Sequence, residues 1–308
     1  METNMSYTGH RYESTDGLSL YYRNYGAGDD VVLCLHGLTR NSKDFNELAM
    51  HLAARWRVIC PDIRGRGQSA WDPRHQHYNP GIYAADAWRL MDGLGITRFA
   101  VIGTSLGGLV AMIMADQQAA RLRGIVLNDI GPEIPGAAVA RIVEYAGQMN
   151  PAANWTEAVR NIRGAYELAL PEMPDAFWEE FTRLSYRENP DGVPKPDMDP
   201  AIGAALRKPP AIITALRWLN RHGMLQRIGG VAIDPWDSFR SISMPCLLLR
   251  GAISDVLTPE IMRKMCAVNQ ELEVVTVPGR GHAPLLDEPE ALHAIDAYLG
   301  VLLVRGRR

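Results

Sequence analysis

Three side chains in this sequence have the types needed for nucleophilic catalysis, and they follow one another in the order Ser105, Asp255 and His282. A serine hydroxyl attacks a carbonyl only when a base removes its proton. That base in turn needs an acid that orients it and stabilises its charge. The sequence therefore predicts a triad with Ser105 as nucleophile, His282 as base and Asp255 as acid.

The residues around Ser105 favour this role. The serine lies in G-T-S-L-G, between an apolar run at 100–102 and an apolar segment of helical length that begins at Leu109. A strand, a sharp turn and a helix with serine at the apex are the setting in which G-x-S-x-G forms a nucleophile elbow. The turn is crowded, so the positions two before and two after the serine must lack bulk, and both are glycine. The alternative is a glycine-rich turn with an inert serine.

Both other members of the predicted triad follow apolar runs typical of buried strands. The run 247–250 precedes the loop with Asp255, and the run 272–277 precedes the loop with His282. In an open parallel sheet the loops at the carboxyl ends of the strands share one edge. The order serine, aspartate, histidine is the one expected for this type of sheet.

Acyl transfer also needs N–H donors directed at the oxyanion that develops during attack. The N–H of Leu106 begins the helix after the elbow, at the positive end of the helix dipole. We expect the second donor after His36-Gly37, as the N–H of Leu38. A plain tight turn is the alternative reading of His36-Gly37.

The chain between these residues alternates strand-like and helix-like segments. Such alternation predicts an α/β fold with a mostly parallel central sheet, flanked by helices and joined by right-handed crossovers. From 133 to 240 the strand runs disappear, and helical patterns interrupted by prolines take their place. We therefore predict a core formed by 1–132 and 241–308, with a helical cap inserted at 133–240.

Composition restricts the partners. The formal net charge of -3 gives no electrostatic reason to expect nucleic acid or an anionic membrane. No apolar run is long enough for a membrane span and the first residues lack the apolar core of a signal peptide, which predicts a cytoplasmic protein. The four cysteines are widely spaced, and the histidines at 75 and 77 are interpreted as surface residues of a loop, so we expect no metal and no cofactor.

Five motifs, H-G-L-T-R, P-D-I-R-G-R-G-Q-S, G-T-S-L-G-G, S-D-x-L and G-R-G-H-A-P, together resemble the α/β-hydrolase fold family. The resemblance implies the triad and the oxyanion amides given above, and it identifies the helical insertion with the cap of that family. It also offers Asp129 as an alternative to Asp255, because some members carry their acid at the end of that strand. A serine at the elbow speaks against the dehalogenase and epoxide hydrolase branches, whose nucleophile is aspartate.

The predicted activity is hydrolysis of a small to medium, largely apolar carboxylic ester or lactone through an acyl-enzyme. Alternatives are carbon–carbon hydrolysis of aromatic ring-cleavage products with the same triad, an acyltransferase, and a small-molecule receptor that retains the fold. The loop after His36 lacks the extra small residues expected of a carbon–carbon hydrolase. Arg40 is a candidate to bind a substrate carboxylate. Its alternatives are a solvated side chain and a pair with a carboxylate of the protein.

Overall fold

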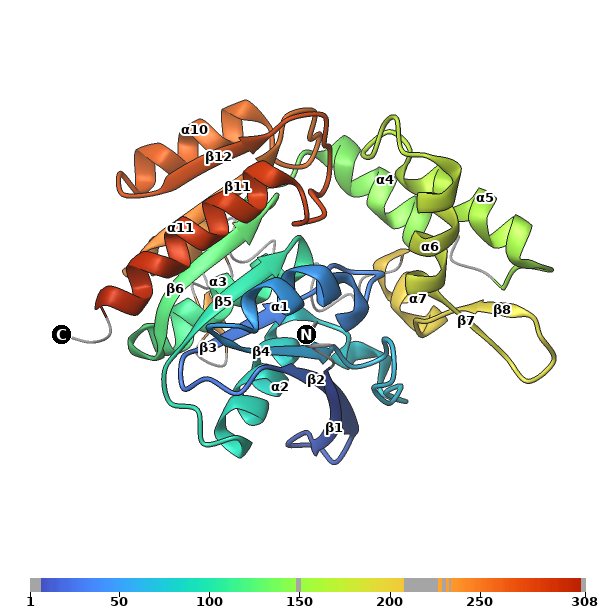
Figure 1. Ribbon diagram of the computed structural model, residues 1–308, viewed down its shortest axis with the longest axis horizontal. Helices are drawn as coiled ribbons and strands as arrows, with labels where there is room; N and C mark the ends of the chain where they lie inside the picture. The colour runs from blue at the N-terminus through green and yellow to red at the C-terminus, as the bar shows by residue number, and fades with distance from the viewer. Residues whose placement is uncertain (1–6, 148–150, 208–226, 229–230, 233, 306–308) are drawn as a thin grey trace, which may run out of the picture.

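The computed structural model of the protein describes residues 7–147, 151–207, 227–228, 231–232 and 234–305. Its centre is an eight-stranded sheet in the order β1-β2-β4-β3-β5-β6-β11-β12 (Figure 1). The strands are β1 (Thr8–Glu13), β2 (Ser19–Tyr25), β3 (Val31–Leu35), β4 (Arg57–Asp62), β5 (Phe99–Thr104), β6 (Leu122–Asn128), β11 (Cys246–Gly251) and β12 (Glu273–Val277). The strands from β4 to β12 in that order run parallel, whereas β1 and β2 pair antiparallel at one edge. The predicted fold class is confirmed.

Helices cover both faces of the sheet. One face packs against α2 (Pro80–Gly93), α3 (Leu106–Gln118), α9 (Pro235–Arg240) and α10 (Pro259–Val268). The other packs against α1 (Asn46–Leu52) and α11 (Pro289–Arg305). Among the described helices, none is long and apolar enough to cross a membrane.

Burial on both faces explains the uninterrupted apolar strands. All five residues of β3 are buried. Leu33 and Leu35 belong to one core cluster, while Val32 and Cys34 belong to the other. Successive side chains of a strand point to opposite faces, so a strand covered on both sides reads as continuously apolar.

The segment after β6 forms a separate group of helices at one end of the sheet. It contains α4 (Gly136–Gly147), α5 (Trp155–Tyr166), α6 (Asp175–Ser185), the pair β7 (Tyr186–Glu188) and β8 (Pro194–Pro196), and α7 (Pro200–Arg207), which Figure 1 shows in green to yellow at one end of the sheet. The two remaining strands are β9 (Arg227–Ile228) and β10 (Val231–Ala232). A separate apolar cluster that includes Ile162, Trp178 and Phe181 joins α5, α6 and α7.

The predicted cap limits, 133 and 240, remain a prediction. Residues 208–226 of that segment lie outside the described residues. The last element within the predicted cap, α9, places Phe239 in the cluster beneath the sheet rather than in the cluster of the cap. By packing, α9 belongs with the core.

Candidate active site

Ser105 lies at the apex of a strained turn between β5 and α3. Its backbone angles are φ 53 and ψ -113, a region that non-glycine residues adopt at a cost of about 1–3 kcal/mol. The turn is held by the Ser105 N–H, which donates to Asn128 O at 3.0 Å. A β-carbon at Gly103 would lie 2.4 Å from Gly107 O, and one at Gly107 would lie 1.9 Å from Leu35 O. Both flanking glycines are therefore required by close backbone approach.

Ser105 and His282 meet, as the sequence predicts. The Ser105 Oγ lies 2.8 Å from His282 Nε2, and His282 Nδ1 lies 2.8 Å from Asp129 Oδ2. A carboxylate accepts hydrogen bonds and donates none, so Nδ1 carries a proton. In the neutral ring Nε2 is then left to accept the serine proton. The contacts form an unbroken path from hydroxyl through imidazole to carboxylate.

The prediction that Asp255 orients His282 is wrong; Asp129 occupies that position. Asp255 has a side chain 52% exposed, and Arg141 of α4 donates to both its carboxylate oxygens at 2.9 and 2.7 Å. Asp129 follows directly after β6, which lies in the sheet between β5 and β11, and it is completely buried. An aspartate immediately after a buried strand is a signal that the sequence did contain.

Two further donors fix the Asp129 carboxylate. Gly251 N–H donates to Oδ1 at 2.8 Å, and Ser254 Oγ donates to Oδ2 at 2.5 Å. Both donors come from the end of β11 and the loop after it. The loop in which the acid was expected therefore supplies hydrogen-bond donors to an acid on the neighbouring strand. Sequence reasoning missed Ser254.

His36 fixes the peptide between Gly37 and Leu38. Its Nε2 accepts the N–H of Ile63 at 3.0 Å, so its proton resides on Nδ1, which donates to Gly37 O at 2.7 Å. Burial lowers the pKa of His36 to about 3, against the opposing effect of the hydrogen bond to Gly37, so the ring is neutral near pH 7. In a trans peptide the N–H points opposite to the C=O. The N–H of Leu38 therefore points away from His36.

The other side of Leu38 is held by Arg66. The Arg66 Nε donates to Leu38 O at 3.0 Å, while its Nη1 donates to Arg64 O and to the hydroxyl of Tyr83. Arg66 is fully buried. Arg66 thus holds its own loop, through Arg64 O, and also the segment after His36, through Leu38 O.

The loop after Gly37 lies next to the elbow. A β-carbon on Gly37 would be 3.9 Å from the β-carbon of Ser105. Leu106 is the first residue of α3, and the N–H groups of a first helical turn have no partner within the helix. Two backbone segments with fixed orientation thus border Ser105, and the oxyanion role of the Leu38 and Leu106 amides remains a prediction.

Arg40 connects the core to the predicted cap. Its Nε and Nη2 donate to the two oxygens of Asp44, each at 2.7 Å, and its Nη1 donates to Ser185 at the end of α6. The guanidinium carbon lies 3.9 Å from the ring centroid of Phe181. The carboxylate beside Arg40 thus belongs to the protein itself, and substrate binding by Arg40 stays a prediction.

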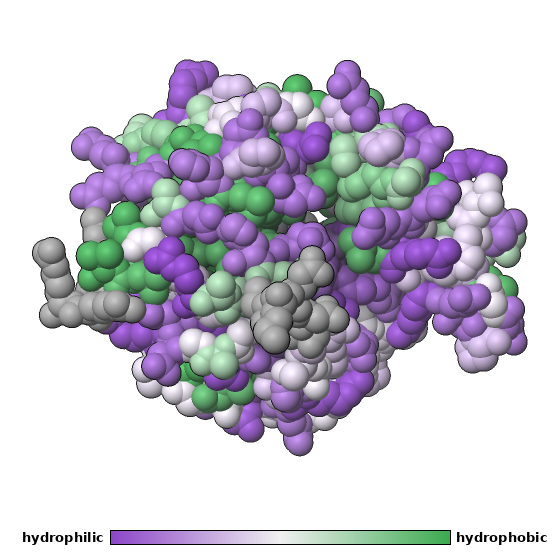
Figure 2. Space-filling view, in the orientation of Figure 1, coloured by the Kyte–Doolittle hydropathy of each residue, from purple (hydrophilic) through white to green (hydrophobic). Residues whose placement is uncertain are grey.

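The predicted cap also contacts the residues that follow Leu38. Thr39 Oγ1 lies 2.8 Å from the Tyr166 hydroxyl, and Asn41 Nδ2 donates to Leu184 O at 2.7 Å. Trp178 and Phe181 are buried in the cap's own cluster. On the face shown in Figure 2, hydrophilic residues cover much of the outer side of the cap.

His77 has the acidic neighbours that the sequence alone did not indicate. Its Nδ1 lies 2.9 Å from Asp72 and 3.2 Å from Asp16, and these three groups are close enough to hold a cation. Arg64, however, donates to both carboxylates, and Arg74 pairs with Asp16 as well. The guanidinium groups already neutralise these oxygens, so the donor set does not fit a metal ion.

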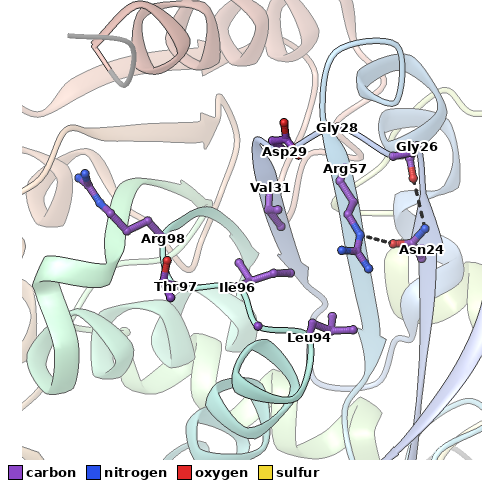
Figure 3. A pocket seen from close by; sticks show the side chains of 12 residues that line it. Asn24, Gly26, Gly28, Asp29, Val31, Arg57, Leu94, Ile96, Thr97 and Arg98 are labelled. Carbon is purple, nitrogen blue, oxygen red and sulfur yellow. Dashed lines mark hydrogen bonds between the residues drawn. The ribbon is translucent and has the colours of Figure 1, made fainter.

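A hollow of about 560 Å³ lies at the end of the sheet where β3, β4 and β5 begin. Figure 3 shows Val31, the first residue of β3, and residues 94–98, which precede β5, along its wall. Arg57 enters it and donates from Nε to Asn24 at 2.7 Å. Ser105 follows the carboxyl end of β5, so this hollow is not part of the candidate active site.

The chain belongs to the α/β hydrolase family, because the model of that family matches residues 32–295. The family resemblance of the motifs is confirmed. Over 87% of its length the chain is 32% identical to the 3-hydroxybutyrate-oligomer hydrolase of Cupriavidus necator, of which it covers 88%.

Solved structures agree with this assignment. An α/β hydrolase from Novosphingobium aromaticivorans is 36% identical, with a TM-score of 0.83 and coverage of 98% of this chain and 99% of that one. The structure of an E-2-(acetamidomethylene)succinate hydrolase has the same fold at 23% identity, with a TM-score of 0.78 over 96% of this chain and all of that one (100%). Family and relatives together make this chain a hydrolase.

Proposed function

We propose that the protein is a serine hydrolase that cleaves a carboxylic ester through an acyl-enzyme, with Ser105 as nucleophile, His282 as base and Asp129 as acid. The observation that carries this proposal is the path Ser105 Oγ–His282 Nε2 and His282 Nδ1–Asp129 Oδ2, with both distances 2.8 Å. The strained backbone of Ser105 supports it, because such strain is concentrated at functional sites.

In the first step Ser105 Oγ forms a bond to the ester carbonyl carbon while its proton passes to His282 Nε2. Asp129 stabilises the imidazolium that results. The carbonyl oxygen gains the electron pair and becomes an oxyanion, which the N–H groups of Leu38 and Leu106 stabilise. Removing one such donor costs about 3–4 kcal/mol in other serine hydrolases.

In the second step the tetrahedral intermediate collapses. The bond to the alcohol oxygen breaks, and His282 gives its proton to the leaving alkoxide. Water then attacks the acyl-enzyme, His282 takes the proton of that water, and a second collapse releases the acid and restores the Ser105 hydroxyl. Each proton returns through the same imidazole nitrogen.

The substrate class follows from chemistry together with the relative of 32% identity, which is named as a hydrolase of 3-hydroxybutyrate oligomers. Condensation of a hydroxyl with a carboxyl group joins such units by esters, the bond that this site suits. Leu38, beside the elbow, packs against the apolar clusters of both core and cap. A small to medium ester of largely apolar character, with 3-hydroxyacyl esters as the first candidates, is the proposed substrate.

The test compares wild type with Ser105→Ala and His282→Ala on nitrophenyl esters of increasing chain length and on the linear dimer of 3-hydroxybutyrate. We expect turnover by the wild type and a loss of about 1000-fold or more in both variants. Activity retained in Ser105→Ala would contradict the mechanism. Faster turnover of a coloured ring-cleavage diketone than of any ester would replace ester cleavage with carbon–carbon hydrolysis.

A further inference from the structure

We propose that Ser254 is a positioning residue of the triad, whose hydroxyl fixes the Asp129 carboxylate in the orientation that His282 requires. This proposal rests on the proposed function. Ser254 contacts neither Ser105 nor His282 by any hydrogen bond of the described residues; it acts through the acid.

The direction of the Ser254 proton follows from its partners. The Oγ accepts the N–H of Leu257 at 3.0 Å and the N–H of Val256 at 3.3 Å. A hydroxyl has two acceptor lone pairs and one proton. Both lone pairs are occupied by backbone donors, so the proton points to Asp129 Oδ2, 2.5 Å away.

The oxygen that Ser254 contacts is the one that His282 uses. Asp129 Oδ2 accepts from Ser254 Oγ and from His282 Nδ1, whereas Oδ1 accepts from Gly251 N–H. One donor on each oxygen, from the end of β11 and from the loop after it, fixes the plane of the carboxylate independently of the histidine. If Ser254 is removed, Gly251 and the imidazole are the only donors to the Asp129 carboxylate that remain among the described residues.

Burial makes the Ser254 hydroxyl hard to replace. Asp129 is fully buried and Ser254 is 6% exposed, so bulk water has little access to the vacated oxygen. A hydrogen bond to a charged group in such a site contributes more than one in water. We therefore expect an effect on the chemical step rather than on substrate binding.

The first experiment measures kcat and KM of ester hydrolysis for Ser254→Ala and Ser254→Thr. For Ser254→Ala we expect kcat to fall about 10- to 100-fold with KM changed less than about twofold. Ser254→Thr keeps the hydroxyl and should recover most of kcat. Wild-type kcat in Ser254→Ala, or equal losses in both variants at full thermal stability, overturns the proposal.

The second experiment separates action through the acid from general loosening of the loop. In the Asp129→Asn background, Ser254→Ala should cause less than about a twofold further loss, because residues in one network are not additive. A full further loss there overturns the proposal. The Nδ1–H proton resonance of His282 should move in Ser254→Ala, and an unmoved resonance contradicts it.

Failure of the proposed function gives a different pattern. If Ser105→Ala kept full esterase activity, the triad would not catalyse the reaction, whatever Ser254 did. If Ser105→Ala is inactive and Ser254→Ala is indistinguishable from wild type, the serine mechanism stands and the positioning role alone falls.

Discussion

Exchanging the acid for its amide at position 129 and at position 255 separates the two candidate acids. In Asp129→Asn the amide keeps the size of the side chain but brings an N–H₂ group into a site where Ser254, Gly251 and His282 all donate to the carboxylate. When the amide nitrogen takes the place of Oδ2, its N–H₂ faces the Nδ1–H of His282. Two donors then meet unless the imidazole changes tautomer. In the other tautomer Nε2 carries the proton and cannot accept that of Ser105.

The expected decrease in activity follows from this loss of the base. The same exchange in a serine protease triad lowers kcat about 10⁴-fold, equivalent to about 5.4 kcal/mol at about 1.36 kcal/mol per tenfold. We expect a loss of about 10³- to 10⁴-fold for Asp129→Asn. Asp255→Asn removes only a half-exposed pair with Arg141. Such surface pairs are worth about 0–1 kcal/mol, so its activity should stay within about twofold of wild type.

The assay is kcat/KM for nitrophenyl ester hydrolysis, with thermal unfolding as the control for fold. Arg141→Gln breaks the same surface pair from its other side, so it is the matched control for Asp255→Asn and should likewise keep its activity. A large loss in Asp255→Asn together with near wild-type activity in Asp129→Asn would refute the assignment of the acid.

Two further predictions concern stability. Gly107→Ala places a β-carbon 1.9 Å from Leu35 O, so the backbone of the elbow must shift; a clear drop in the melting temperature is expected, and an unchanged one contradicts the close approach. Burial holds the pKa of His36 at about 3, below its ordinary value of 6.5, so between these values the unfolded chain binds the additional proton. The resulting stability is present above about pH 6.5 and is lost as the pH falls toward 3, by at most about 1.36 kcal/mol per pH unit. Denaturant unfolding gives the free energy of unfolding at pH 7 and at pH 4.5. Its decrease between these pH values should be smaller in His36→Gln than in wild type, and equal decreases would show that His36 does not contribute.

Much of the fold could be predicted because the signals are local. Strands covered on both faces appear as apolar runs, as β3 does. The crowded elbow requires glycine at 103 and 107, and this pattern is visible in the sequence. Ser105 and His282 could be paired from the order of strands, since both follow parallel strands that end at one edge.

The acid could not be chosen in the same way. Asp129 and Asp255 both follow strands of the sheet, and the choice depends on how each loop turns. Asp255 pairs with Arg141 of α4 at the surface, whereas Ser254 donates to the buried Asp129. These are contacts between residues more than 100 positions apart in the chain, which no local pattern encodes. Arg66 and Leu38 are only 28 positions apart, but their contact joins two separate loops, which no local pattern encodes either.

In the proposed mechanism, Ser105 carries the acyl group during turnover. Intact-protein and peptide mass spectrometry after a rapid acid quench of ester hydrolysis measures this directly, with Ser105→Ala as control. We predict a mass increase equal to the acyl group, located on the peptide with Ser105 and absent from Ser105→Ala. Turnover without an adduct on that peptide, or an adduct of the same mass in Ser105→Ala, would contradict the serine mechanism.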